Sequence, residues 1–205
     1  GKVMDIVLGV DLTGRKQQHL VKQYVRKYKP LVVIMGPPCT AFARLGQLNR
    51  KLNPETYART RRIGLILAEF TASICGIQRD AGRYYAVENP AYSELFELLV
   101  FVRLWKEGDI AAVIFPQCGL GLTTPEGDPI KKVTEVWTNA PEIIEQFEDV
   151  TCTHERHGDI TGGYHGQRRS ALAQVWPPEM CQRFVEGVCN IIRRVRKSGG
   201  LGYLV

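Results

Sequence analysis

Two side chains that can do chemistry follow apolar runs of the sequence, each at the point where a run ends. Cys39 follows residues 31–35 and the turn Gly36-Pro37-Pro38, and Glu88 follows residues 84–87. A cysteine thiolate is a nucleophile, and a carboxyl group can give or accept a proton. If the two runs are neighbouring parallel strands, both side chains lie above the edge where open α/β sheets bind ligands. The pair therefore indicates covalent catalysis assisted by an acid–base group.

Each of these residues also has a plain structural interpretation. Cys39 can be a small residue in a tight turn, and Glu88 can be a strand-end carboxylate that caps the next helix. The two in this order, each directly after an apolar run, favour the functional interpretation.

A second group of chemically active residues lies in the later part of the chain. Cys152, His154 and His157 fall within six residues, in a glycine-rich region with few core-forming side chains. Cys118 from the preceding segment would complete a Cys₂His₂ set, which suits a tetrahedral structural zinc site. The alternative is a polar loop whose histidines face solvent or phosphate, because the spacing is not that of a standard zinc finger.

The elements that would position these residues alternate between strands and helices. Apolar runs predict strands at 4–10, 31–35, 84–87 and 111–115, and a returning strand at 133–138. Helical spacing predicts helices at 15–28, 54–78, 93–106 and 177–197, with Ser93 as the cap of the third. This order predicts an α/β protein of Rossmann-like type with a mainly parallel sheet.

The character of the chain changes after Pro116, where glycine and proline become frequent. We expect a catalytic α/β portion over residues 1–116 and a hairpin with an irregular recognition or zinc-binding region over residues 117–176. A closing helix and tail would occupy residues 177–205.

Composition narrows the class of protein. A chain of 205 residues with 44% hydrophobic residues can bury a core, and six cysteines are too few for a secreted disulfide scaffold. No apolar run is long enough for a membrane helix, and no signal-peptide pattern is present. We therefore expect an intracellular protein. The net charge of +6 favours an anionic partner, nucleic acid above all.

Several motifs together resemble those of a known family, the cytosine-carbon-5 DNA methyltransferases. Gly36-Pro37-Pro38-Cys39, with Phe42 three residues on, resembles the catalytic loop of these enzymes. Glu88-Asn89 resembles their Glu-Asn motif, and Pro116-Gln117 resembles their Pro-Gln element. Asp11-Leu12-Thr13 is similar to the segment that holds the adenosyl part of S-adenosylmethionine.

The resemblance extends over most of the chain when one branch of the family is considered. Thr138-Asn139, Gly162-Gly163 and the segment Ala173-Gln174-Val175-Trp176-Pro177 resemble the methyltransferase-like domains of retroelement-type polyproteins, which are abundant in dinoflagellates. For a eukaryotic member this implies a nuclear protein, and for any member it implies a DNA partner in preference to RNA.

The resemblance assigns a role to each matching residue. Cys39 would be the nucleophile, and Glu88 would be the acid group at N3 of cytosine. The predicted cofactor-binding residues are Asp11, Leu12 and Pro37. The predicted substrate-binding residues are Asn89, Gln117, Lys131, Arg168 and Arg169.

The chemistry of cytosine explains why this pair would be needed. Carbon 5 is too weak a nucleophile to take a methyl group unaided. Addition of a thiolate at carbon 6 turns the ring into an enamine-like species that can attack a methyl sulfonium. A carboxyl group at N3 stabilises this adduct. The target atom is hidden in a duplex, so the base must be flipped out or already single-stranded.

Three departures from the family pattern bear on activity. The glycine-rich segment over the methionine part of the cofactor is not evident, so an upstream segment or another chain would have to supply it. Cys118-Gly119-Leu120 stands where the family has Arg-x-Arg, and the nearest basic residues are Lys131 and Lys132. No segment matches the usual closing motif of the family.

These departures leave a second hypothesis open, a methyltransferase-derived module that binds nucleic acid without catalysis. A third, a thiol hydrolase built on Cys39, lacks a histidine at a suitable sheet edge. The basic runs at 61–62, 167–169 and 193–197 either contact phosphates or form solvated faces.

Overall fold

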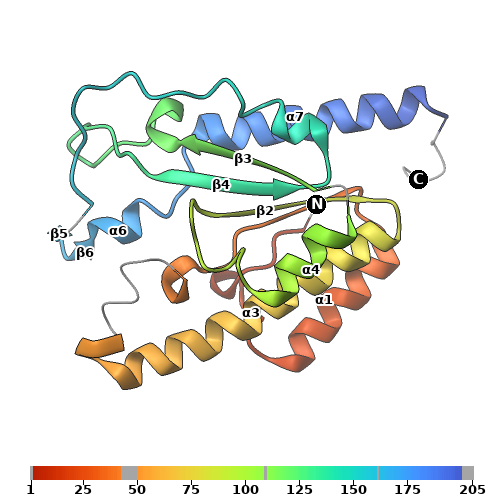
Figure 1. Ribbon diagram of the computed structural model, residues 1–205, viewed down its shortest axis with the longest axis horizontal. Helices are drawn as coiled ribbons and strands as arrows, with labels where there is room; N and C mark the ends of the chain where they lie inside the picture. The colour runs from red at the N-terminus through yellow and green to blue at the C-terminus, as the bar shows by residue number, and fades with distance from the viewer. Residues whose placement is uncertain (1, 43–49, 109, 161, 200–205) are drawn as a thin grey trace. The chain divides into compact units, whose positions relative to one another are not determined.

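The computed structural model describes residues 2–42, 50–108, 110–160 and 162–199 (Figure 1). The chain divides into two compact units, the first within residues 1–110 with residues 137–139, the second within residues 111–136 and 140–201. None of the described helices is both long and apolar enough to cross a bilayer.

The first unit is built on two parallel strands. β1 (Val32–Met35) pairs with β2 (Tyr84–Pro90) in a register that runs from Val32 opposite Tyr84 to Met35 opposite Val87. A long crossover joins them, as parallel strands require. Most of it is α3 (Pro54–Asp80), whose start carries Pro54 at the first position and Asn53 as a cap that accepts from Thr56 N.

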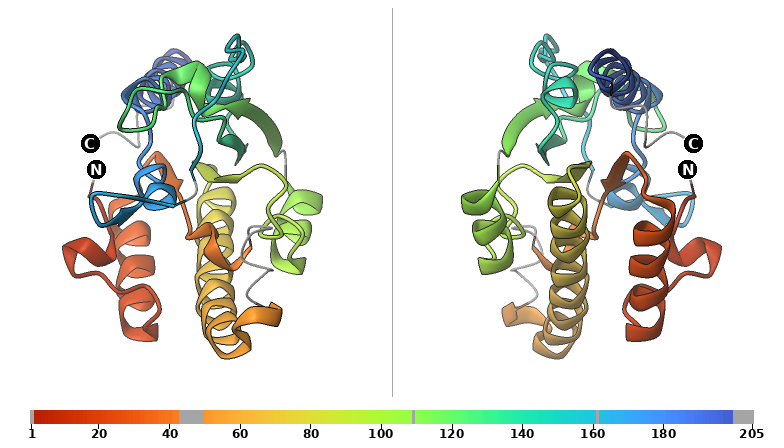
Figure 2. Two further views of the ribbon diagram at one scale, coloured as in Figure 1. Left: turned by 90° about the vertical axis from the view of Figure 1, so that its left-hand side faces the viewer. Right: turned by 90° about the vertical axis from the view of Figure 1, so that its right-hand side faces the viewer.

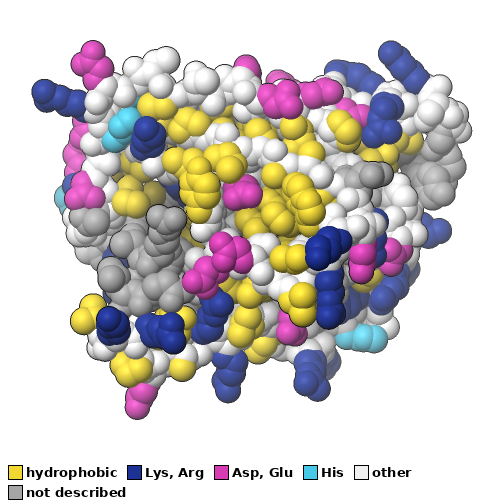
Figure 3. Space-filling view, viewed as in Figure 1, with side chains coloured by type: hydrophobic (Ala, Val, Ile, Leu, Met, Phe, Trp, Pro, Cys, Tyr) yellow, Lys and Arg dark blue, Asp and Glu magenta, His cyan; other side chains and the backbone are white. Residues whose placement is uncertain are grey.

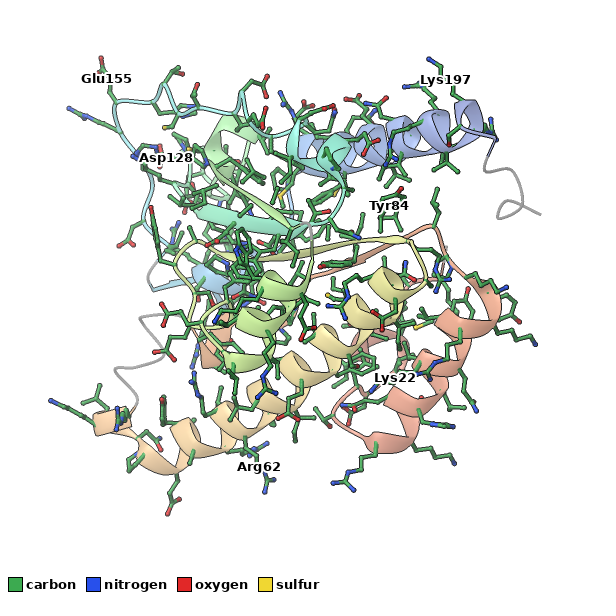
Figure 4. The ribbon with its side chains drawn as sticks, turned by 45° about the vertical axis from the view of Figure 1, so that its right-hand side comes forward. Lys22, Arg62, Tyr84, Asp128, Glu155 and Lys197 are labelled. Atoms are coloured by element: carbon green, nitrogen blue, oxygen red, sulfur yellow. The ribbon has the colours of Figure 1, made fainter. Side chains whose placement is uncertain are left out.

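Three helices accompany this strand pair. Figure 2 shows α3 lying between α1 (Arg15–Tyr28) and α4 (Leu99–Glu107) in one layer. The inward faces of α3 and α4 enclose with β2 an apolar core that includes Ala68, Cys75, Val87, Phe101 and Leu104. α1 packs on α3 in a second cluster. Basic side chains lie along the outer side of α1 and α3 (Figure 3), and Arg62 points away from the helix layer (Figure 4).

A buried amide ties the end of α3 to the beginning of both strands. Gln78 is fully buried, and its Nε2 donates to Pro30 O and to Tyr84 O, each at 2.9 Å. Its Oε1 accepts from Arg83 Nε at 2.8 Å. Both amide hydrogens and the amide oxygen of this side chain are paired, so burying it carries little penalty.

β4 (Val133–Thr138) runs from the second unit into the first. At its first-unit end, Thr138 Oγ1 donates to Tyr85 O at 2.5 Å and Asn139 Oδ1 accepts from Tyr85 N at 2.9 Å. The strand order is β1-β2-β4-β3, with β1–β2 the one parallel pair of this described sheet. The α/β prediction is confirmed, but the prediction of a mainly parallel sheet is wrong. β4 returns antiparallel and occupies the place where β3 (Ala111–Pro116) would have paired with β2.

The second unit contains β3, the rest of β4 and several short elements. These are η3 (Gln117–Leu120), α5 (Pro141–Ile144), the β5–β6 hairpin (Gly163–Tyr164 and Gln167–Arg168), α6 (Arg169–Leu172) and the long α7 (Pro178–Lys197). Aromatic rings pack against one another in the core of this unit. The ring centre of Phe147 lies 4.4 Å from that of Phe115, on which it stacks, and 4.9 Å from that of Phe184.

Two predicted elements are wrong. Residues 4–10 are not a strand; they hold the 3₁₀ turn η1 (Ile6–Leu8), with Val7 89% exposed. Asp5 closes this turn locally by accepting from Val7 N at 2.8 Å. The helix predicted to begin at Ser93 begins at Leu99, because Ser93 Oγ instead accepts from Leu95 N in a preceding turn. The other predicted strands and helices are confirmed, with shifts at their ends.

Candidate functional site

The two residues predicted to do chemistry lie at one edge of the β1–β2 pair. β1 ends at Met35, and the turn Gly36-Pro37-Pro38 leads directly into η2 (Cys39–Ala41). Glu88 lies one position beyond the partner of Met35, and it is 6% exposed. Because β1 and β2 are parallel and adjacent, the cysteine turn and the glutamate follow the same ends of neighbouring strands, as predicted. The thiol of Cys39 is half-buried.

Asn89 fastens these two segments to each other. Its side chain is fully buried, and Nδ2 donates to the carbonyl oxygen of Pro37 at 2.9 Å. The same Nδ2 lies 3.3 Å from the carbonyl oxygen of Glu88. Since both of these partners are acceptors, the amide must present its nitrogen to them. Asn89 Oδ1 is buried and has no hydrogen-bond partner among the described residues.

Arg61 of α3 holds the far end of the cysteine turn. Its Nη1 donates to Ala41 O at 2.9 Å and to Glu94 Oε2 at 2.7 Å, and its guanidinium lies 5.0 Å from the centre of the Phe42 ring. The backbone of Glu94 adds a further bond, from its N to Phe42 O at 3.3 Å. Sequence reasoning placed Arg61 in a surface basic pair and missed this role. The sequence feature that indicates this role is the helical spacing that places Arg61 on the same face of α3 as Gly64 and Ala68.

Gly64 lets η2 approach α3 closely. A Cβ at this position would lie 2.3 Å from the Cβ of Ala41 and 3.2 Å from ring carbons of Phe42. No side chain larger than hydrogen fits there without moving η2. The segment that carries Cys39 is thus held at its start by Asn89, at its end by Arg61, and along one side by α3.

The three predicted cofactor residues have different surroundings in the described structure. Asp11 is exposed, and its Oδ1 accepts from Thr13 N at 2.9 Å and from Thr13 Oγ1 at 2.7 Å. These bonds hold the pKa of Asp11 below its usual value. Leu12 packs on a core cluster of the first unit, and the Pro37 carbonyl is taken by Asn89. Asp11 and the Pro37 carbonyl thus have partners within the chain, and Leu12 packs on the core.

The other predicted substrate residues belong to the second unit. Gln117 is fully buried, and its Nε2 donates to Thr134 Oγ1 at 2.7 Å, while its Oε1 has no partner among the described residues. Lys131 and Arg168 are exposed. Arg169 donates two hydrogen bonds to the carboxylate of Glu126, and these lower the pKa of that carboxyl to about 2. Only Asn89 of the predicted substrate residues is in the same unit as Cys39.

The second unit brings the four predicted metal ligands together. One ligand atom from each of Cys118, Cys152, His154 and His157 lies within 4.8 Å of the others. The Sγ atom of Cys152 is 3.1 Å from His157 Nε2 and 3.6 Å from His154 Nδ1. The Sγ atom of Cys118 is 3.7 Å from His157 Nε2. Cys118 comes from η3, and the other three come from a loop that precedes β5.

The two thiols of this cluster differ in their ionisation. Burial raises the pKa of Cys118 to about 11, whereas hydrogen bonding from His154 lowers the pKa of Cys152 to about 6. Cys152 is therefore the thiol that is readily deprotonated near neutral pH, beside two imidazoles.

Comparison of the chain with models of protein families, with curated proteins and with solved structures gives no match. Function must therefore be argued from the two sites themselves. The first offers a held cysteine and a buried glutamate at the same edge of two parallel strands, with a buried amide oxygen that has no partner among the described residues. The second offers two thiols and two imidazoles at the spacing of a metal site.

Proposed function

We propose that this chain is the catalytic portion of an S-adenosylmethionine-dependent methyltransferase that acts on carbon 5 of cytosine, in DNA by preference over RNA. The observation that carries the proposal is the 2.9 Å hydrogen bond from Asn89 Nδ2 to Pro37 O. It joins the Gly-Pro-Pro-Cys turn to the Glu-Asn pair at the ends of two parallel strands, which is the juxtaposition that the resemblance requires.

The first unit also supports a Rossmann-like assignment. Its β1–α3–β2 segment is a parallel strand pair with a helical crossover, which is the repeating unit of such folds. Ligands of these folds bind beyond the carboxyl ends of the strands, and Cys39 and Glu88 lie at this end. We therefore assign the first unit to that fold class as part of the proposal.

In the proposed reaction, the Cys39 thiolate adds to carbon 6 of cytosine and forms a carbon–sulfur bond. The electron pair of the 5,6 double bond moves toward carbon 5 and N3, and a protonated Glu88 stabilises N3 by hydrogen bonding or proton transfer. Loss of the carbon 5 proton and of the thiolate later restores the ring. S-adenosylmethionine would supply the methyl group, at a site that the described residues do not complete.

The held position of Cys39 suits this chemistry. A nucleophile that is already oriented loses less entropy on reaching the adduct, and this can account for several kcal/mol of the barrier. Arg61 and Gly64 supply that orientation without contacting the base, and Asn89 supplies it through Nδ2, which holds Pro37 O. The buried acceptor Asn89 Oδ1 would then find its donor in the exocyclic amine of cytosine.

A methyl-transfer assay tests the proposal. Radiolabelled S-adenosylmethionine is incubated with mixed-sequence DNA or RNA and the wild-type chain, Cys39→Ala, or Cys181→Ser as a control at an exposed cysteine. We expect label on cytosine with wild type and Cys181→Ser and none with Cys39→Ala. Transfer by Cys39→Ala at the wild-type rate would overturn the assignment of the nucleophile.

A second candidate function, nucleic-acid binding without catalysis, has one observation in its favour. The segment at residues 4–10 is an exposed turn and not the strand that would place Asp11 at a cofactor. Nucleic acid that is bound without any label transferred, in the presence of added S-adenosylmethionine, would favour this second function.

A further inference from the structure

We propose that Cys118, Cys152, His154 and His157 bind one structural Zn²⁺ ion, which fastens the loop at residues 151–158 to η3. This site lies within the second unit and is independent of methyl transfer. Bonds of about 2.3 Å to sulfur and about 2.0–2.1 Å to nitrogen put the ligand atoms of a tetrahedral zinc about 3.3–3.8 Å apart. Three of the four sulfur–nitrogen pairs in this cluster are 3.1, 3.6 and 3.7 Å apart, and all four ligand atoms lie within 4.8 Å of one another, so small side-chain shifts would bring them to this range.

Close packing of the backbone supports this arrangement of the ligands. A Cβ at Gly119, next to Cys118, would lie 2.4 Å from the carbonyl oxygen of Thr151, next to Cys152. The absence of a side chain at Gly119 therefore allows the two cysteine-bearing segments to touch.

The other end of the ligand loop is held in the same way. Gly158 N donates to Pro129 O at 2.8 Å, and a Cβ at Gly158 would lie 2.5 Å from the side chain of Thr124. Glycines thus flank the ligand set where the backbone must pass close to its neighbour.

The composition of the set indicates the metal and its role. Two thiolates and two imidazoles are the ligands that zinc prefers in proteins, and they suit the hard cations Ca²⁺ and Mg²⁺ poorly. Four protein ligands fill a tetrahedral shell and leave no position for water or substrate. The role is therefore structural and not catalytic.

The loop needs such a cross-link. Residues 151–160 contain no helix or strand, and their side chains are exposed or only half-buried. Glu155, at the outer side of this loop, points away from the protein (Figure 4). A segment of this kind buries too little apolar surface to hold itself, and metal binding can supply the missing free energy.

A metal titration tests the proposal with the wild-type chain. The protein is washed with a chelator, its metal content is measured by mass spectrometry, and Zn²⁺ or Co²⁺ is added back. We expect one ion per chain and, with Co²⁺, the intense visible absorption of a tetrahedral site with sulfur-to-cobalt charge transfer. A zinc content near zero after reloading, or an octahedral cobalt spectrum, would overturn the proposal.

Matched variants then assign the ligands. We expect Cys152→Ser and His157→Asn to lose the ion and the cobalt spectrum. Cys181→Ser and His165→Asn should keep both, since Cys181 is exposed and the positive φ of His165 suits asparagine.

The melting temperature of the wild-type protein should fall after chelation. The melting temperature of each ligand variant should not change when chelator is added. One ion per chain retained in both ligand variants would contradict the assignment. A Cys118–Cys152 disulfide in protein purified without chelator would also contradict the assignment, because the sulfurs of a disulfide cannot ligate zinc as thiolates.

Discussion

Asn89 connects the two parts of the candidate active site through one side chain. Its nitrogen holds the turn before Cys39, and its oxygen is buried at the site without a partner among the described residues. A buried acceptor that is left unsatisfied costs about 1–3 kcal/mol of stability. The arrangement is therefore one in which a ligand that donates a hydrogen bond would relieve a cost already present in the protein.

Two substitutions at Asn89 test whether the hydrogen bond from its side-chain nitrogen, and not only the volume of the side chain, stabilises the protein. Asn89→Ala removes the donor to Pro37 O and leaves that carbonyl unpaired, so we expect the free energy of unfolding to fall by about 1–3 kcal/mol. Asn89→Asp should destabilise more, because an ionised carboxylate would face the carbonyl oxygens of Pro37 and Glu88. Urea denaturation at neutral pH measures both. Equal stabilities of Asn89→Asp and wild type would show that the bond does not hold the turn.

The placement of Cys39 and Glu88 at one sheet edge could be predicted from the sequence, but the long-range partners of the site residues could not. Cys39 and Glu88 stand out by type and by their place after apolar runs. The bond from Asn89 to Pro37 spans 52 positions, and the bond from Arg61 to Ala41 spans 20. Arg61 differs from its exposed neighbour Arg62 in sharing a helix face with Gly64 and Ala68, but the sequence does not show that this face meets η2.

Among the elements, α3 does most to position the cysteine turn. Gly64 allows the contact with Ala41 and Phe42, Arg61 bonds the end of η2, and Gln78 bonds the start of both strands. A single helix therefore sets the position of both ends of the β1–η2 segment.

A pair of glycine substitutions in α3 tests this dependence. Gly64→Ala would bring a Cβ to 2.3 Å from the Cβ of Ala41, so we expect a loss of about 1–3 kcal/mol from overpacking. In Gly76→Ala the new Cβ meets nothing within 4 Å, so we expect a gain of about 0.5–1 kcal/mol from helix propensity. Denaturation of both variants gives the comparison. A gain in both would contradict the close contact between α3 and η2.

The pairing of α5 with α7 should make stability depend on pH. Burial raises the pKa of Glu142, but hydrogen bonds from Arg194 outweigh it, so the net pKa is below the usual value. A lowered pKa means that the folded state binds fewer protons than the unfolded state as pH falls. The stabilisation is thus present above the ordinary glutamate pKa of about 4.3 and is lost as pH drops through the folded value.

Glu142→Gln removes this titration. We expect the variant to be less stable than wild type at neutral pH and the difference between them to shrink in acid. Thermal melts from neutral to acidic pH measure the difference. A difference that stayed constant over this range would show that the Glu142–Arg194 pair does not contribute through its charge.

The elements themselves follow closely from the sequence, whereas their order in the sheet does not. Apolar runs located β1, β2, β3 and β4, and helical spacing located α1, α3 and α7. The place of β4 between β2 and β3 depends on long-range pairing, which an apolar run does not encode. The prediction of a strand at residues 4–10 is wrong because the apolar residues of this segment are exposed, and apolar character alone does not show burial.

At the scale of the whole molecule, the chain carries two separate kinds of chemistry. The first unit holds the cysteine and glutamate suited to activating a base, and the second holds a cluster suited to zinc. The net charge of +6 suits a polyanionic substrate for such a protein. The site for the proposed methyl donor is the part that the described residues leave incomplete, so an assay that does not require the donor complements the methyl-transfer assay.

The measurement that tests the central claim most directly is exchange of the hydrogen at carbon 5 of cytosine with water. Addition of Cys39 at carbon 6 activates carbon 5 with or without a methyl donor. DNA tritiated at this carbon is incubated with wild type, Cys39→Ala, Glu88→Gln and the control Cys181→Ser. We predict tritium release by wild type and the control, none by Cys39→Ala, and release slowed about 10²–10⁴-fold by Glu88→Gln. DNA bound by wild type without release, or release by Cys39→Ala at the wild-type rate, would contradict the account.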